Sequence, residues 1–170
     1  MQAQESNFIA VGAQPCDVEG ILAVFEQNRF DPSLLPREVE SIRADLQDFI
    51  VVKTASGELL GCAALKADSK QIAEILSVGV LPTRQGKGVG SLLIRECERL
   101  AQARGYQRLW LATMKPDYFA CFGYRRFSKW KLPARVLLRK LRLVLKQPVA
   151  RWWPELLGPM FFMERSLGPE

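Results

Sequence analysis

The residues best suited to chemistry are the glycines and cations between Arg84 and Ser91, which read R-Q-G-K-G-V-G-S. Every second residue from 86 to 90 is glycine, so the backbone can adopt positive φ and approach a ligand closely. The segment precedes a helical pattern, and amides at a helix start converge where the helix dipole adds partial positive charge. With Arg84 and Lys87 beside them, these amides predict a binding site for a diphosphate group.

Two familiar phosphate motifs do not fit this segment. A P-loop needs G-x-x-x-x-G-K followed by Ser or Thr, and Lys87 is followed by Gly88. A dinucleotide fingerprint needs G-x-G-x-x-G early in a βαβ unit, whereas these glycines have another spacing and follow three successive predicted strands. The pattern that does occur is Q-x-x-G-x-G, formed by Gln85, Gly88 and Gly90 after a V-x-V-x-P strand end.

This pattern resembles the acyl-CoA signature of the GNAT (Gcn5-related N-acetyltransferase) superfamily. The segment Pro116–Tyr124 is similar to the aromatic-aromatic-x-x-x-Gly-aromatic element of that family. The predicted order of elements matches the fold over residues 7–130, with 159–167 as the closing strand. The resemblance implies a mixed α/β (α+β) fold: a mostly antiparallel sheet of six to seven strands, flanked by helices.

The resemblance also implies acetyl-CoA as cosubstrate, without a metal. The amides from Gln85 to Ser91 would hold its diphosphate, and the backbone of Val78–Val80 would pair with the pantetheine amides as an added strand does. The thioester would lie where strands 71–81 and 108–113 separate. The cofactor-binding residues expected on this basis are Val78, Gly79, Val80, Arg84, Gln85, Gly86, Lys87, Gly88, Val89, Gly90 and Ser91.

The expected reaction is direct attack of a primary amine on the thioester in a ternary complex. The amine must first lose a proton, and Glu74 stands where the family often places a carboxylate base. Its alternative role is that of a strand glutamate that positions substrate or solvates the strand. The family's usual proton donor is a tyrosine at the position of Phe119, so Tyr118 and Tyr124 are the candidate acids. A thiolate can also leave unassisted.

The acceptor is a small-molecule or peptide amine that the sequence does not identify. Residues 111–124 are similar to N-acetylglutamate synthase-like amino-acid acetyltransferases, yet Leu76 replaces the arginine that those proteins carry two residues after the carboxylate. The sequence therefore does not identify glutamate as the substrate. Because Phe119 replaces the usual tyrosine, a non-catalytic acyl-CoA-binding sensor or membrane-recruited module is the alternative function.

The elements that position these residues follow from periodicity and turn residues. Strands are expected at 8–13, 48–54, 59–67, 71–81, 108–113, 124–130 and 159–167, and helices at 15–28, 37–46, 91–104 and 117–122. Together they form one N-acetyltransferase domain over residues 1–170.

Composition excludes several other functions. The chain of 170 residues contains no histidine, which rules out Ser-His-Asp and Cys-His mechanisms.

The first residues lack the basic end and apolar run of a secretory signal, and the four cysteines form no C-x-x-C pair. We therefore expect reduced thiols in a cytoplasmic protein. A buried, packing role is favoured for Cys121 over one near the cofactor thiol.

Positive charge is concentrated in one segment. Residues 125–153 hold ten Lys or Arg and no Asp or Glu, although the net charge of the chain is only +6. Residues 131–158 are expected to form a basic amphipathic insertion. Three roles stay open: a lid packed on the core, peripheral contact with an anionic membrane through residues 131–153, or attraction of an acidic partner or substrate. No nucleic-acid motif is present, and the oligomeric state is not determined.

Overall fold

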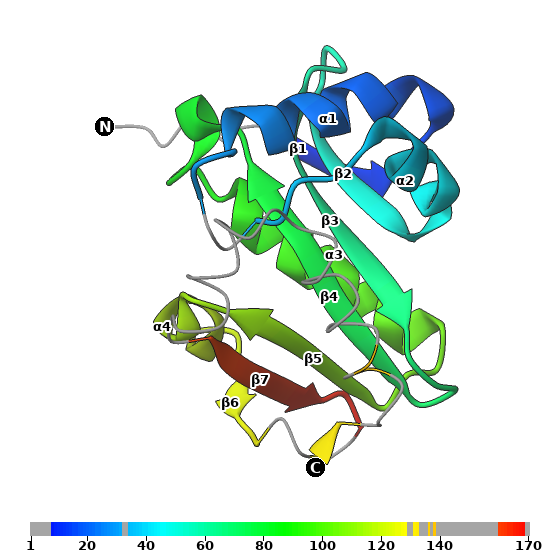
Figure 1. Cartoon of the computed structure of the whole chain (residues 1–170), viewed down its shortest axis with the longest axis vertical. Coiled ribbons are helices and arrows are strands. Elements are labelled where there is room, and N and C mark those ends of the chain that lie inside the picture. The colour runs from blue at the N-terminus through cyan, green and yellow to red at the C-terminus, as the bar shows by residue number, and fades with distance from the viewer. Residues whose placement is uncertain are drawn as a thin grey trace. The chain divides into compact units, whose positions relative to one another are not determined.

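The computed structural model describes residues 8–31, 34–128, 131–132, 136, 138 and 160–168. Seven strands form a mostly antiparallel sheet in the order β1-β2-β3-β4-β5-β7-β6, and helices flank it (Figure 1). The strands are β1 (Phe8–Gly12), β2 (Phe49–Thr54), β3 (Leu59–Ala67), β4 (Ile72–Val80), β5 (Arg108–Thr113), β6 (Arg125–Arg126) and β7 (Phe161–Ser166). The α-helices are α1 (Val18–Gln27), α2 (Val39–Ala44), α3 (Val89–Ala103) and α4 (Pro116–Ala120).

The chain divides into two compact units. The first comprises Met1–Lys66 and Ile75–Arg104, and the second comprises Ala67–Glu74 and Gly105–Glu170. Strand β4 begins in the second unit and ends in the first. The expectation of a single domain stays a prediction.

In the first unit, side chains alternate between the two faces of the strands. One face of β2 and β3 carries Phe49, Val51, Cys62 and Ala64, which form a buried cluster with residues of α1 and α2. Figure 1 shows these two helices side by side over the strands. Gly61 points to the other face, where an added Cβ would lie 3.1 Å from Val89 Cγ1 and 3.3 Å from Leu93 Cδ1. Helix α3 therefore packs on that face, which places its N-terminus beside the end of β4.

In the second unit, β5 pairs with β7 along its whole length, from Arg108↔Ser166 to Thr113↔Phe161. Trp110 is 1% exposed and stacks on Phe162, and its indole N–H donates to Asp68 Oδ2 at 2.6 Å. The beginning of β4 runs parallel to β5, with Glu74 opposite Trp110. A buried tryptophan with a satisfied N–H thus anchors the strand that carries Glu74.

Most predicted elements are confirmed, and the differences lie at their ends. The second helix is shorter than predicted: α2 ends at Ala44 and a 3-10 turn over Leu46–Asp48 follows. Of the predicted strand 124–130, residues 129 and 130 lie outside the described residues, and within 124–128 the residues paired with β7 as β6 are Arg125 and Arg126. β3 and β5 have the predicted bounds.

The expectations for the basic insertion lie almost wholly outside the described residues. Of residues 131–158, the structure describes 131, 132, 136 and 138. Leu132 and Val136 are buried in a cluster with Trp110, and Leu138 is 48% exposed. Among the described helices, none is long and apolar enough to cross a bilayer.

A charged network joins α2 to β3 through Asp45. Its carboxylate accepts hydrogen bonds from Lys66 Nζ at 3.0 Å and from the guanidinium of Arg37. Burial by itself raises the pKa of Asp45, but these hydrogen bonds and positive charges outweigh burial and hold the pKa below its ordinary value of 3.8. The ionised carboxylate therefore stabilises the folded first unit.

We expect Asp45→Asn to lower the thermal unfolding midpoint at pH 7 by a few degrees. Because the folded-state pKa is depressed, this stabilisation is present above the unfolded-state pKa and is lost as the pH falls through the folded-state pKa. Unfolding curves at pH 7, 4 and 2.5 should show the two proteins converging below about pH 4. The matched control is Asp48→Asn. Because burial raises the pKa of Asp48, its charged carboxylate destabilises the fold, and Asp48→Asn should raise the unfolding midpoint at pH 7. A constant difference between wild type and Asp45→Asn at all three pH values would contradict this account.

Candidate functional site

The glycine-rich segment forms an open turn directly before α3. Gly86 has φ +74° and Gly88 has φ +85°, and Gly88 is the residue at the N-cap of α3. Because the N-cap residue is a glycine, it provides no side-chain cap for the first amides of α3. A Cβ added at either glycine would meet no heavy atom within 4 Å. The turn therefore has open space beside both glycines, which lets a ligand approach its backbone.

The two cations of the segment have different surroundings. The Arg84 guanidinium donates to both carboxylate oxygens of Glu58, at 3.1 and 3.0 Å. Lys87 is exposed, and within the described part of the chain it makes no ion pair. Among the described residues, Glu58 therefore compensates Arg84, and no carboxylate pairs with Lys87.

The remaining residues of the segment contribute in unequal ways. Val89 is 1% exposed and its side chain packs over Gly61, so only its backbone can face a ligand. Gln85 is exposed, but its amide Nε2 donates inward, to Val80 O and to Asn28 Oδ1, both at 3.2 Å. Asn28 was absent from the sequence-based candidates. Its place after a helical pattern indicated a helix end and gave no sign of a link to residue 85.

The end of β4 has an irregular backbone. Ser77 has φ +57°, a left-handed conformation that non-glycine residues rarely adopt, and its carbonyl accepts a hydrogen bond from Cys62 Sγ at 3.8 Å. Two residues on, Gly79 allows α1 to pack closely, because an added Cβ would lie 2.7 Å from Val24 Cγ1. Gly79, expected as a cofactor residue, therefore has a packing role that the sequence did not reveal. Leu76, at the position of the family's arginine, packs against the apolar cluster.

The three candidate catalytic residues lie in the second unit. Glu74 is 1% exposed, so it does not serve to solvate the strand. Tyr118 is 38% exposed and Tyr124 is 2% exposed. Both tyrosine rings make edge contacts with the ring of Phe119, at 5.2 and 6.2 Å between centroids. The structure thus brings the aromatic element together around a buried phenylalanine.

Cys121 corrects the sequence-based interpretation. A buried, packing cysteine was favoured there, but Cys121 is exposed and its Sγ donates to Asp117 O at 3.4 Å. The single turn of helix before it explains the exposure, because the chain leaves α4 at Ala120 and turns toward Gly123 at the surface.

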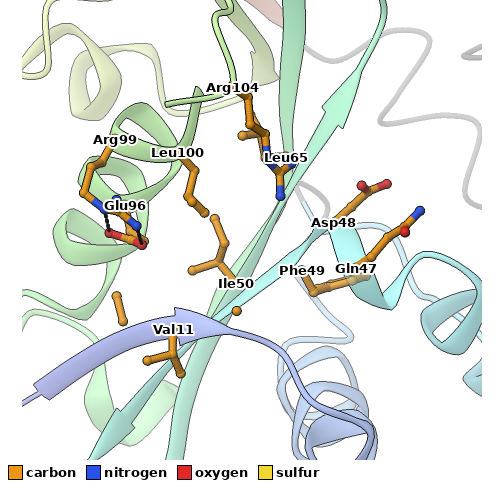
Figure 2. Close-up of a pocket in the computed structure, with 12 residues that line it drawn as sticks. Val11, Gln47, Asp48, Phe49, Ile50, Leu65, Glu96, Arg99, Leu100 and Arg104 are labelled. Carbon is orange, nitrogen blue, oxygen red and sulfur yellow. Dashed lines mark hydrogen bonds and ion pairs between the residues drawn. The ribbon is translucent and has the colours of Figure 1, made fainter. Parts of the chain in front are cut away.

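A separate hollow of about 340 Å³ lies in the first unit, between β1, β2 and the second half of α3. Figure 2 shows Ile50 near its centre and Glu96 paired with Arg99 on one side. Its described lining residues lie outside the glycine-rich segment and outside β4. Its charged groups, Asp48, Glu96, Arg99 and Arg104, carry no net charge in sum. Over the described residues, no group of three or more potential metal ligands occurs.

Known proteins are similar to this chain in sequence and in fold. The family model described as Acetyltransferase (GNAT) family matches residues 19–128. An uncharacterized N-acetyltransferase of Chlorobaculum tepidum is 28% identical over 124 residues, which cover 73% of this chain and 79% of that protein. An amino-acid acetyltransferase of Ralstonia nicotianae is 31% identical over 139 residues, covering 74% of this chain and 31% of that protein.

The fold is that of solved acetyltransferase structures. The N-acetylglutamate synthase of Neisseria gonorrhoeae, complexed with coenzyme A and N-acetyl-glutamate, superposes with a TM-score of 0.80 at 24% identity. The match covers 98% of this chain and 37% of that one. This chain therefore spans about a third of that synthase and of the Ralstonia enzyme.

Proposed function

Because the chain belongs to the acetyltransferase (GNAT) family, we propose that it transfers the acetyl group of acetyl-CoA to a primary amine, acting as a single domain. The amine nitrogen attacks the thioester carbonyl carbon, the C–S bond breaks, and the products are an N-acetyl amide and free CoA. The amine proton passes to a base, and the CoA thiolate takes a proton from an acid or from water.

The observation that carries the proposal is the open turn before α3. Gly86 and Gly88 combine positive φ with empty space at the Cβ position, and Gly88, the N-cap residue of α3, has no side chain to cap the helix. Backbone amides arranged in this way bind phosphate groups through hydrogen bonds and the helix dipole. Lys87 adds a positive charge that no described carboxylate compensates. These features suit the diphosphate of CoA, and the Neisseria synthase of the same fold was solved with coenzyme A.

We assign the proton transfers to residues of the second unit. Glu74 would accept the amine proton, directly or through water, and its burial excludes a role at the surface. Tyr118 and Tyr124 are the candidate donors to the leaving thiolate. Tyr118 is the more exposed of the two, so its hydroxyl is more accessible to a bound thiol.

One observation favours the alternative of an acyl-CoA sensor without catalysis. The position of the family's tyrosine holds Phe119, which is buried and has no proton to give. A thiolate with a pKa of about 8.5 still leaves without an acid, so Phe119 alone does not exclude turnover.

Calorimetry with CoA, followed by thiol release from acetyl-CoA over a panel of amines, tests both functions. The panel should include amino acids, since relatives are named amino-acid acetyltransferases. Binding with turnover of at least one amine supports the transferase, and binding without any turnover supports the sensor. If CoA does not bind to the folded protein, both functions are wrong.

The Glu58–Arg84 pair gives a prediction about cofactor affinity. Glu58→Gln removes the ion pair and leaves Arg84 able to contact the CoA diphosphate. The Kd for CoA should fall by roughly two- to fourfold at low salt, a small change because an exposed ion pair holds Arg84 only weakly. The gain should fade at high ionic strength. Glu40→Gln, which makes the same charge change at an exposed position of α2, is the matched control. An equal gain in both variants would mean that overall charge, and not Arg84, is responsible.

A further inference from the structure

The side chain of Asn28 joins three separate parts of the first unit. It is 8% exposed, and its Nδ2 donates to Val24 O at 2.8 Å and to Val80 O at 3.0 Å. Its Oδ1 accepts a hydrogen bond from Gln85 Nε2 at 3.2 Å. The end of α1, the end of β4 and the glycine-rich turn therefore meet at one buried amide.

These partners require an asparagine at this position. Two carbonyl oxygens lie against Nδ2, and an N–H donor lies against Oδ1, so neither the reversed amide nor an aspartate satisfies all three. A residue that only ended α1 would need no more than the bond to Val24. The other two partners lie 52 and 57 residues further along the chain.

The carbonyl oxygen of Val80 accepts two side-chain hydrogen bonds in this arrangement. It accepts from Asn28 Nδ2 and also from Gln85 Nε2, at 3.0 and 3.2 Å, which occupies both of its lone pairs. A ligand that pairs with the end of β4 must therefore use other backbone groups. Gln85 in turn precedes the amides of Gly86 to Gly88, so its fixed side chain sets where the turn leaves the strand.

We propose that Asn28 is a positioning residue for the cofactor: through Gln85 and Val80 it fixes the turn whose amides hold the CoA diphosphate. This inference rests on the proposed function. It predicts that Asn28 affects ligands that carry the diphosphate and leaves the binding of pantetheine, which lacks it, unchanged.

The test measures Kd for CoA by calorimetry and for pantetheine by ligand-observed NMR. Asn28→Ala and the isosteric Asn28→Asp should raise the Kd for CoA by about tenfold, as expected for loss of one or two hydrogen bonds that orient the turn. Gln85→Met, which keeps the length of the side chain and removes its donor, should have a similar effect. In turnover, KM for acetyl-CoA should rise while kcat changes by less than about threefold.

Coupling between the two residues separates positioning from simple loss of stability. If Asn28 acts through Gln85, the double variant Asn28→Ala/Gln85→Met should bind CoA about as well as the weaker single variant. Ile42→Val is the matched control, because it loosens the buried α2 contact without touching the turn and should leave both Kd values unchanged.

Three results with the Asn28 variants would overturn the inference. They are an unchanged Kd for CoA in Asn28→Ala, an equal loss of pantetheine and CoA binding, and additive effects in the double variant. If Asn28→Ala does not fold, the test uses Gln85→Met, because Gln85 is exposed and its substitution should not affect folding. Normal CoA binding by Gln85→Met then rejects the proposal. Failure of the wild type to bind CoA would instead reject the proposed function itself.

Discussion

Gly88→Ala is expected to weaken CoA binding by about 30-fold or more while the protein stays folded. At φ +85° a Cβ costs about 1–2 kcal/mol, so the turn would shift toward a conformation that no longer presents its amides. The added methyl group also enters the open space where the diphosphate would lie, since no protein atom occupies it within 4 Å. Calorimetry with CoA and thermal unfolding of the same samples measure the two effects separately.

The chain provides matched controls for this substitution. Gly57, in the turn between β2 and β3, has φ +88°, and Gly105, after α3, has φ +78°. Neither would bring a Cβ within 4 Å of another atom. Gly57→Ala and Gly105→Ala should therefore lose a similar amount of stability, about 1 kcal/mol, with the Kd for CoA within about twofold of wild type. If Gly88→Ala binds CoA as these controls do, the turn does not hold the diphosphate.

Glu74→Gln is expected to lower kcat by about 100-fold or more and to leave the Kd for CoA within about twofold. A positioned general base contributes roughly that much, and the amide keeps the shape of the side chain without accepting the proton. The variant would depend on amine already deprotonated in solution, so its rate should rise about tenfold per pH unit below the amine pKa. Steady-state rates between pH 6 and 9, with the best amine of the panel, test this.

Asp68→Asn is the control for removing a buried carboxylate from the same unit. Asp68 is 9% exposed and accepts the Trp110 hydrogen bond, which an asparagine oxygen can still accept. The kcat of the Asp68→Asn variant should stay within about threefold of wild type. A Glu74→Gln enzyme with wild-type kcat would exclude Glu74 as the base, and equal losses in both variants would point to a general disturbance of the second unit.

Much of the fold could be predicted because its signals are local. β3 and β5 match their expected bounds because turn residues and a polar link delimit them, and those act over a few positions. The glycine-rich turn was predictable for the same reason: Gly86 and Gly88 permit the positive φ that the structure shows. Within the described residues 124–128, β6 is shorter than expected, because the length of an edge strand depends on its partner and β7 pairs there with Arg125 and Arg126.

The sequence by itself determined the order of elements, the glycine-rich turn and the family resemblance, since each rests on residues close together in the chain. Only the tertiary structure decided which partners the side chains meet. Glu58 compensates Arg84 from 26 residues away, and Asn28 binds Gln85 across 57 residues. Such pairings have no periodic signature, because a hydrogen bond between distant segments depends on where the whole chain packs. The burial of Glu74 and the exposure of Cys121 were hidden in the sequence for the same reason.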